Sequence, residues 1–471
     1  MKGKRFLVLC LLAVMAFGSL WAQTEPISLR PVPGREVDMS WFRERRLGLF
    51  LVWGLYTQTQ GIWKGQKGTE FISLQYKIPN AEMAELARQM NPVNFDAEAI
   101  VLAAKRAGMG YIVITAKHQE GFVMYDSPCN DFNIVKMSPW GRDPLKELSD
   151  ACQKHDIKFC VYYSLGRDFE DPDVGSNWPR IGGRSNDWDF PDEKNKRFER
   201  YFERKVKPQI REILTQYKVD MLWFDVHGFC TPFQSLELMQ MIESLSPGCL
   251  VNDRVGNSYG DFFTPEQTVL KGICREPWES CVTVGRVWSY TNYDTIYKSS
   301  EVLARLATDI VAKGGNLLLS VPPTHLGELT PMGLDRLRAL GDWMAVNGEA
   351  VNGTQPWHVY GESFVPARRT ASADADMPDT VKDETDKDTE PDIRFTCKPG
   401  VLYIMARSWK DPWVRVEDLL LTPEQKITKV ELLGYSGQID YTLDGEGIEM
   451  ALPTSYRPEI PLYVYKLTLS E

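Results

Sequence analysis

The feature that most constrains the fold is an alternation of short apolar runs with longer amphipathic stretches between about residues 40 and 355. The apolar runs are hydrophobic at nearly every position, which is typical of parallel strands buried on both faces. Six or more such units over roughly 300 residues favour a (β/α)8-like barrel over an open doubly wound sheet. No glycine-rich phosphate loop follows the first run, so a nucleotide-binding fold is not predicted. The predicted strands cover 47–54, 110–118, 158–166, 219–225, 249–254 and 316–323, and the predicted helices cover 97–109, 143–157, 192–217, 301–314 and 333–348.

Segments of different character flank the barrel, which we expect over residues 23–357. Residues 1–22 combine early basic residues, a short apolar run and a small residue before Gln23, which is the pattern of a secretory signal peptide. We therefore expect an exported protein, periplasmic or extracellular. Residues 358–471 contain short strand-like runs separated by turn signals, which predict an antiparallel β-sandwich. An acidic stretch near 370–392 predicts a solvated loop, with a cation site as the alternative.

Charge and composition narrow the possible partners. The net charge of −10 disfavours nucleic acid, and no run after the signal segment is long enough to span a membrane. The five histidines are scattered without a metal-binding spacing, so no metal or other cofactor is predicted. Eight cysteines follow Cys10 without a CxxC pair, and several lie in apolar runs as buried thiols do. The 14 tryptophans fit either large cores or platforms for sugar rings.

In a barrel of this type the active site lies at the carboxyl ends of the strands. Asp225 closes the apolar run MLWF and is the strongest candidate for a catalytic carboxylate, although a strand-end Asp can also cap a turn. Aromatic neighbours would exclude water and strengthen its field on a cation-like centre. Arg254 would clamp a substrate oxygen, or pair with Asp253 or Asp225. The other candidate substrate-binding residues lie at or near strand ends and are Trp53, His118, Gln119, Tyr163, Trp223 and Trp288, with core packing as the alternative for the tryptophans.

Glycoside cleavage needs a second carboxylic acid to protonate the leaving oxygen. Glu266 in GDFFTPEQ and Glu279 in REPWESC are both predicted to lie in loops after strands, and Glu276 is a weaker candidate. Trp278 would desolvate Glu279 and raise its pKa, as a general acid requires. The sequence leaves the choice between Glu266 and Glu279 open, and a capping or surface role is the alternative for each.

A series of segments in fixed order between about Trp41 and Trp357 carries a resemblance to a known family. They include LGLFLVWGLYT, GYIVITAKHQEGF, GRDPLKELSDACQKHDIKFCVYYSL, LWFD, VNDR, GDFFTPEQ, WESC and GGNLLLSVPP. Together they resemble the retaining α-L-fucosidases, a family of glycoside hydrolases. The resemblance implies a (β/α)8-like barrel followed by a β-sandwich, and hydrolysis of a terminal α-linked L-fucose through a covalent intermediate. The expected partner is therefore an oligosaccharide or glycoconjugate. The family's nucleophile falls on Asp225 and its pocket arginine on Arg254, while its acid/base varies in position.

The sequence departs from the family pattern at residues that hold the sugar hydroxyls. Where the family usually has His-Trp-Gly, this chain has Val52 before Trp53. Where it usually has a His pair before Asp-Gly-Phe, this chain has His118, Gln119 and Glu120. The family's Glu-Trp-Tyr is matched to Ile62-Trp63-Lys64. We therefore expect an altered glycone pocket, so a glycosidase with another glycone and a non-catalytic carbohydrate-binding protein remain alternatives to a fucosidase. A second carboxylate in the pocket would favour an enzyme.

Overall fold

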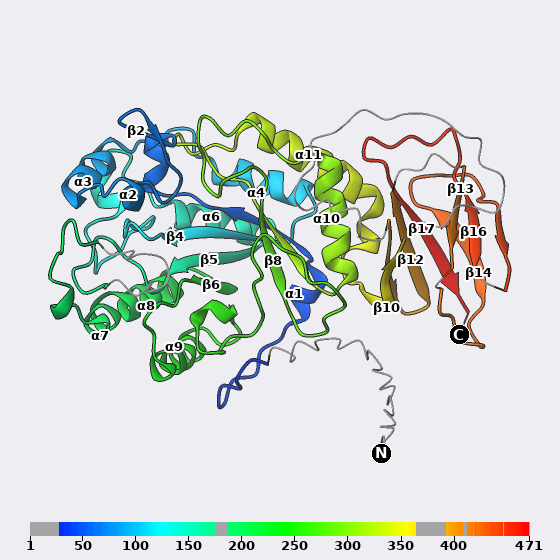
Figure 1. Ribbon diagram of the computed structural model, residues 1–471, viewed down its shortest axis with the longest axis horizontal. Helices are drawn as coiled ribbons and strands as arrows, with labels where there is room; N and C mark the ends of the chain where they lie inside the picture. The colour runs from blue at the N-terminus through cyan, green and yellow to red at the C-terminus, as the bar shows by residue number, and fades with distance from the viewer. Residues whose placement is uncertain are drawn as a thin grey trace, which may run out of the picture.

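The computed structural model describes residues 28–175, 186–363, 392–407, 412–417, 419–445 and 447–470. The predicted signal peptide and nearly all of the acidic stretch lie outside these ranges. The chain forms a barrel-like α/β body and a smaller all-β body, which lie side by side (Figure 1). The predicted fold class is therefore confirmed.

The barrel body is built on a curled sheet of seven strands in the order β7-β6-β5-β4-β1-β9-β8, and every pairing is parallel. Nearly every residue of these strands is buried, because helices cover the outer face and side chains fill the interior. This burial explains why most residues of these strands are apolar, although β8 carries Glu279, Ser280 and Thr283. The strands are β1 (Leu47–Leu51), β4 (Tyr111–Lys117), β5 (Lys158–Ser164), β6 (Met221–Asp225), β7 (Leu250–Val251), β8 (Glu279–Thr283) and β9 (Asn316–Ser320).

An irregular segment fills the space between the short strand β7 and strand β8. Phe262 forms an isolated parallel bridge with Asn252, which follows β7, whereas Glu266 bridges Cys281 of β8. The backbone N–H of Cys281 also donates to the carbonyl of Pro265. We call residues 261–267 the closing segment. It completes the barrel in place of an eighth regular strand and carries Glu266 to the edge where the strands end.

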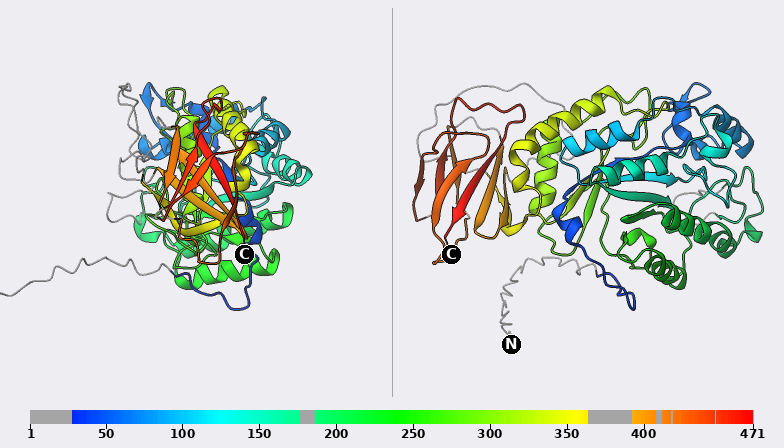
Figure 2. Two further views of the ribbon diagram at one scale, coloured as in Figure 1. Left: turned by 90° about the vertical axis from the view of Figure 1, so that its right-hand side faces the viewer. Right: turned by 180° about the vertical axis from the view of Figure 1, so that it is seen from behind.

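Helices surround the sheet, and their starts follow local sequence rules (Figures 1 and 2). The side chain of Asp143 caps α6 ahead of Pro144, as the Asp-Pro pair predicts. The single helix predicted over 192–217 is wrong in detail, because the α-helical part begins at Phe198, after a short 3-10 helix, and a five-residue π-helix, η3 (Phe202–Val206), interrupts it. The α-helices of the barrel body are α1 (Ser40–Glu44), α2 (Ile72–Gln75), α3 (Asn80–Gln89), α4 (Ala97–Arg106), α5 (Ile134–Met137), α6 (Pro144–Lys154), α7 (Phe198–Tyr201), α8 (Lys207–Gln216), α9 (Pro232–Leu245), α10 (Ser300–Ala312) and α11 (Pro331–Asn347).

Four short 3-10 helices and one hairpin complete the barrel body. They are η1 (Leu55–Thr59), η2 (Glu193–Asn195), η4 (Asp253–Val255), η5 (Gly348–Ala350) and the hairpin of β2 (Ile62–Trp63) with β3 (Gln66–Lys67).

The C-terminal body consists of a five-stranded and a three-stranded antiparallel sheet around an apolar core of its own. It packs against α10 and α11 (Figure 2), where Trp343 Nε1 donates to the carbonyl of Leu462 over 3.0 Å. Met405 and Val464 belong to the same buried cluster as the barrel interior, so this face of the C-terminal body packs tightly on the barrel. The strands are β10 (Gln355–Glu362), β11 (Ile393–Lys398), β12 (Val401–Arg407), β13 (Trp413–Val416), β14 (Ile427–Leu432), β15 (Tyr441–Leu443), β16 (Ile448–Ala451) and β17 (Leu462–Leu469).

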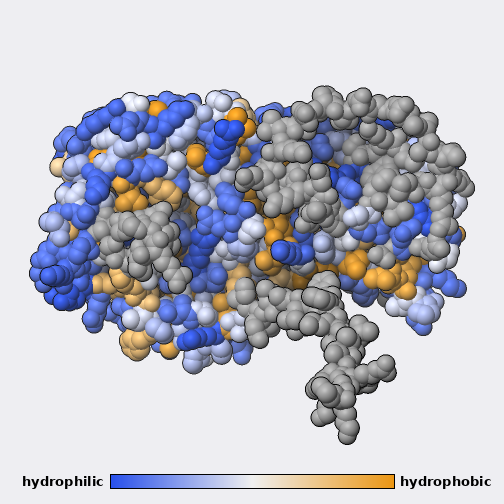
Figure 3. All heavy atoms as spheres, in the orientation of Figure 1, coloured by the Kyte–Doolittle hydropathy of each residue, from blue (hydrophilic) through white to orange (hydrophobic). Residues whose placement is uncertain are grey.

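The described surface is mostly hydrophilic on the face seen in Figure 3, with hydrophobic residues in separate patches. Within the described ranges, no helix is long and apolar enough to cross a membrane. All eight cysteines that follow Cys10 are free thiols, and five of them are buried. The expectation of buried thiols rather than disulfides is therefore confirmed.

Candidate active site

A pocket opens where the barrel strands end, and its floor and walls come from several strands. Phe50 of β1, Tyr162 of β5, Trp223 of β6 and Cys281 of β8 line it together with Asp225, the last residue of β6. Parallel strands end at the same edge of the sheet, which is why residues far apart in the sequence meet here. The remaining lining residues are Val52, Glu70, Phe71, His118, Arg254, Glu266 and Trp288.

Asp225 is held by two donors, one on each carboxylate oxygen. The Tyr162 hydroxyl donates to Oδ2 over 2.8 Å, and Arg254 Nη1 donates to Oδ1 over 2.8 Å. Burial alone would raise the pKa of Asp225, but the charge and hydrogen bonds of Arg254, the Tyr162 hydroxyl and His118 lower it below the usual value. Asp225 therefore stays ionised near neutral pH, the state a carboxylate nucleophile requires.

Glu266 lies close to Asp225 because both contact the same guanidinium. Arg254 Nη1 is 2.8 Å from Asp225 Oδ1 and 3.0 Å from Glu266 Oε2, so the two oxygens are at most 5.8 Å apart, the sum of these contacts. The Glu266 side chain is 45% exposed against 17% for Asp225. Asp225 is thus the less exposed of the two, and Glu266 is the one that water and a leaving group can reach.

Arg254 is fixed in place by neighbours other than the two carboxylates. Its Nε donates to Thr264 Oγ1 over 3.0 Å and its Nη2 to the Thr264 carbonyl over 3.1 Å. The guanidinium lies over the Trp223 ring, 4.7 Å from the ring centroid. Asp253, the other predicted partner, accepts instead from the Thr264 hydroxyl. Arg254 therefore pairs with the pocket carboxylates from a rigid position.

Glu279 lies elsewhere, and the prediction that it belongs to a loop is wrong. It is the first residue of β8, fully buried, and is not among the residues that line the pocket. Its carboxylate accepts from Trp223 Nε1 over 2.9 Å and from the Tyr111 hydroxyl. Burial raises the pKa of Glu279 to about 7, although these hydrogen bonds lower it. A raised pKa alone does not make Glu279 the acid catalyst. Its carboxylate is buried behind Trp223 and does not reach the pocket, so it cannot protonate a leaving group there.

Of the other predicted residues, His118, Trp223 and Trp288 line the pocket, whereas Trp53, Gln119 and Tyr163 do not. Trp53 is fully buried, stacks on Phe95 and donates from Nε1 to the Thr324 carbonyl. Gln119 accepts from Arg167 Nη1 over 3.2 Å, and Tyr163 donates to Gln209 over 2.7 Å. Side chains alternate along a strand, so Tyr163 points outward and its neighbour Tyr162 faces the pocket.

Glu70 and Phe71, which precede α2, were not predicted as site residues. Both line the pocket, whereas Trp63 and Lys64 do not, so Glu70 brings a carboxylate to the pocket that the Ile62-Trp63-Lys64 segment lacks. Glu70 is buried and accepts from the Ser289 hydroxyl over 3.3 Å. Burial raises its pKa, and the nearby His118 opposes that rise. Thr69-Glu70-Phe71 was the sequence signal for this position.

Comparison with known proteins decides the family. The family model for α-L-fucosidase matches residues 30–349, more than half of the chain. The chain belongs to the α-L-fucosidase family. It is 27% identical to the tissue α-L-fucosidase of Rattus norvegicus, covering 90% of this chain and 86% of that protein. It is 28% identical to the plasma α-L-fucosidase of Homo sapiens, covering 88% of this chain and 85% of that protein.

Solved structures of α-L-fucosidases share the architecture. The enzyme from Vibrio sp. strain EJY3 superposes with a TM-score of 0.79 at 28% identity, over 92% of this chain and 73% of that one. An α-L-fucosidase from Lactobacillus casei, solved with its α-L-fucose product, gives a TM-score of 0.63 at 34% identity. That match covers 65% of this chain and 98% of the Lactobacillus chain. The members of this α-L-fucosidase family are glycoside hydrolases that act on fucosylated glycans.

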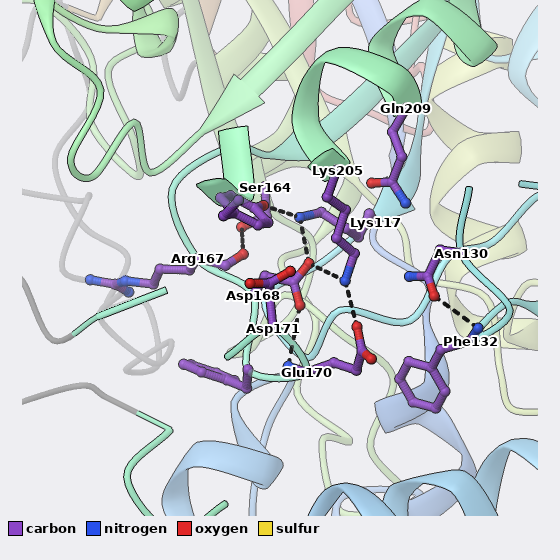
Figure 4. A network of polar contacts seen from close by, with 12 residues as sticks. Lys117, Asn130, Phe132, Ser164, Arg167, Asp168, Glu170, Asp171, Lys205 and Gln209 are labelled. Carbon is purple, nitrogen blue, oxygen red and sulfur yellow. Dashed lines mark hydrogen bonds and ion pairs between the residues drawn. The ribbon is translucent and has the colours of Figure 1, made fainter. Parts of the chain in front are cut away.

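Next to the α-L-fucosidase pocket, a buried network of charges supports the end of β4 (Figure 4). Lys117 Nζ donates to Asp168 Oδ2 over 3.0 Å and to the Tyr201 hydroxyl over 2.5 Å. Lys205, from the π-helix η3, lies 2.8 Å from Asp168 Oδ2 and 2.6 Å from Glu170 Oε2. Burial lowers the pKa of Lys117 to about 8, whereas the two lysines hold the pKa of the buried Asp168 below its usual value. No member of this network lines the pocket.

Proposed function

We propose that the protein is an exported, retaining α-L-fucosidase that releases terminal L-fucose from glycans. The observation that carries the retaining mechanism is the separation of at most 5.8 Å between oxygens of Asp225 and Glu266. Retaining glycosidases hold their two carboxyl groups about 5–5.5 Å apart, whereas inverting enzymes need about 6.5–9.5 Å to admit a water molecule.

In the first step, Asp225 attacks the anomeric carbon while Glu266 gives its proton to the glycosidic oxygen. The bond between the anomeric carbon and that oxygen breaks, and the aglycone leaves as an alcohol. Arg254 and the Tyr162 hydroxyl orient the attacking carboxylate, since each contacts one of its oxygens. Asp225 becomes the covalent partner of the sugar.

In the second step, Glu266, now ionised, takes a proton from water as that water attacks the anomeric carbon. The bond to Asp225 breaks, its carboxylate is restored, and the sugar leaves with its starting configuration. The greater exposure of Glu266 supports this role, because the residue must meet both the leaving group and water.

The pocket walls fit a deoxy sugar in a terminal position. Glu70 and His118 supply polar atoms for sugar hydroxyls, and Phe50, Val52 and Phe71 supply apolar surface. A pocket of this composition binds an apolar ring edge on one side and hydroxyl groups on the other. Export is supported by the signal-peptide pattern of residues 1–22.

The proposal is tested with purified mature protein and an aryl α-L-fucoside, followed by ¹H NMR of the anomeric proton of the released sugar. We expect α-L-fucose to appear first and then to equilibrate, and we expect the Asp225→Ala variant to be inactive. Initial release of β-L-fucose would contradict retention. Turnover of another aryl glycoside alone would show a changed glycone. Binding of L-fucose without turnover of any glycoside would show a carbohydrate-binding protein.

A further inference from the structure

A tight turn after β4 carries two polar side chains to one buried location. The turn spans His118–Gly121, and the backbone N–H of Gly121 donates to the His118 carbonyl over 3.1 Å. Gly121 has φ +86°, and a Cβ there would lie 2.3 Å from Asp168 Oδ1. The turn is therefore packed against the Lys117–Asp168 network on one side, while His118 and Glu120 extend from it. His118 Nδ1 and Glu120 Oε2 are 3.5 Å apart.

Four buried polar atoms at this location have no hydrogen-bond partner: two acceptors on Glu120, and one atom each on His118 and Tyr56 that can donate. Both carboxylate oxygens of Glu120, His118 Nδ1 and the Tyr56 hydroxyl are buried and make no hydrogen bond. The Glu120 side chain is only 1% exposed, so water cannot readily solvate it. Buried polar groups without partners are rare and costly in folded proteins. Two of these atoms, His118 Nδ1 and Glu120 Oε2, lie just beyond hydrogen-bonding distance, so a small shift would pair them.

The Tyr56 ring and the Glu120 carboxylate both lie next to the Cα of Gly54. A Cβ on Gly54 would lie 3.1 Å from Tyr56 Cζ and 3.0 Å from Glu120 Oε1, so the phenol and the carboxylate converge on one point. Burial raises the pKa of Tyr56, and the charge of Glu120 raises it further. The charge of Glu70 also raises the pKa of Tyr56, and the Thr115 side chain opposes the rise. Of the two carboxylates, Glu120 is the one that lies next to the Tyr56 ring at Gly54.

Rings on three sides confine the His118 imidazole. Tyr162 stacks on it at 5.5 Å, Tyr56 meets it edge-on at 5.2 Å, and Phe71 lies 5.9 Å away. The charged groups that act on it are Glu120, Glu70 and Asp225. With Nδ1 directed at Glu120, Nε2 is the ring nitrogen left for a sugar hydroxyl in the pocket.

We propose that Glu120 is a positioning residue for glycone binding. Its carboxylate accepts the Nδ1–H of His118 and the hydroxyl of Tyr56, and so fixes the His118 tautomer that offers Nε2 to the sugar as an acceptor. The 3.5 Å separation shortens to a hydrogen bond when the sugar fills the pocket, as contacts in ligand-free sites often do. A carboxylate behind a functional histidine commonly fixes ring orientation in this way.

The first test is spectroscopic and does not need turnover. The chain has five histidines, so ¹⁵N-histidine labelling with a His118→Gln reference identifies the His118 ring signals. We expect Nδ1 to be protonated and Nε2 unprotonated, more completely with saturating L-fucose, and we expect Glu120→Gln to change this distribution. A protonated Nε2 in the wild type, or an unchanged tautomer in Glu120→Gln, would overturn the proposal.

The second test is a double-mutant cycle on kcat/KM for an aryl α-L-fucoside, and this part rests on the proposed fucosidase function. We expect Glu120→Gln to lower kcat/KM about 10- to 100-fold, the range for losing a hydrogen bond to a charged group. In a His118→Ala background the same change should have almost no further effect, because Glu120 acts through His118. Independent, multiplicative losses would contradict the role and indicate a merely structural carboxylate.

Glu212 provides a matched control. It is a carboxylate that also accepts from a buried tyrosine, with Tyr125 OH 3.0 Å from its Oε2, but it does not line the pocket. We expect Glu212→Gln to keep kcat/KM within about twofold while lowering the melting temperature. Inactivity of the wild type on all fucosides would refute the proposed function, and the ¹⁵N spectra would still decide the role of Glu120.

Discussion

At the scale of single residues, exposure and position distinguish the two candidate acids. Glu279 has a pKa of about 7 but is sealed beneath Trp223, whereas Glu266 is 45% exposed beside Asp225. The sequence showed two glutamates in similar contexts. The local sequence could not show that Glu279 begins strand β8 whereas Glu266 lies in the closing segment, because both placements depend on how the strands pair.

Glu266→Gln should remove acid catalysis without removing the nucleophile. We expect kcat/KM to fall about 10²- to 10⁴-fold for a phenyl α-L-fucoside, whose leaving group needs a proton. For a dinitrophenyl fucoside, whose leaving group needs little help, the loss should be much smaller. The ratio of the two losses is the measurement, and equal losses would exclude Glu266 as the acid.

Glu279→Gln should affect stability and its pH dependence more than chemistry. In the folded state the pKa of Glu279 is about 7, whereas in the unfolded state it is about 4.5. Between these two pH values the folded protein therefore keeps a proton on Glu279 that the unfolded chain has lost. The stability contributed by this group is therefore complete below about pH 4.5 and is lost as pH rises through 7, by about 3 kcal/mol in all.

Urea unfolding at pH 4.5, 6 and 7.5 measures this contribution. The wild type should lose stability with rising pH relative to Glu279→Gln, because the amide cannot ionise. The variant should also retain most of its fucosidase turnover. A parallel pH dependence in the two proteins would show that Glu279 does not titrate in this range.

At the scale of elements, the sequence predicted the existence of the strands well and their details less well. Mostly apolar runs marked β4, β5 and β6, because both faces of a barrel strand are buried, whereas β8, with the sequence ESCVT, was not predicted as a strand. Local pattern could not reveal the closing segment, whose residues 261–267 pair only through isolated bridges. Nor could local pattern reveal the register shift between β4 and β5 at Thr115 and Lys117. Such an irregularity changes the side of the sheet to which the following side chains point.

The buried network of Lys117 offers a test at this scale. Lys117→Met should lower the free energy of unfolding by about 3–5 kcal/mol, because it removes one of the two cations that compensate the buried Asp168. The double variant Lys117→Met/Asp168→Asn should recover part of this loss, since the uncompensated charge is gone. Chemical denaturation measures both, and a double variant as unstable as the sum of its single changes would contradict the pairing.

At the scale of the whole molecule, the C-terminal sheets have a core of their own, but several of their residues, including Met405 and Val464, pack into the buried cluster of the barrel. Trp343 lies within it and donates to Leu462 across the boundary. We therefore expect a single calorimetric transition for the mature protein, and a lower midpoint for the whole transition in Trp343→Ala. Two separate transitions in the wild type, or a shift of only one, would show independent domains.

The proposed mechanism depends most on Asp225 being the nucleophile of a retaining enzyme. The most direct measurement is mass spectrometry of the protein after treatment with 2-deoxy-2-fluoro-α-L-fucosyl fluoride, which slows breakdown of a glycosyl intermediate. We predict one added fluorofucosyl group per chain, on the peptide that contains Asp225, and none on Asp225→Ala. Attachment to another residue, or rapid turnover by a reaction that inverts configuration, would contradict the mechanism.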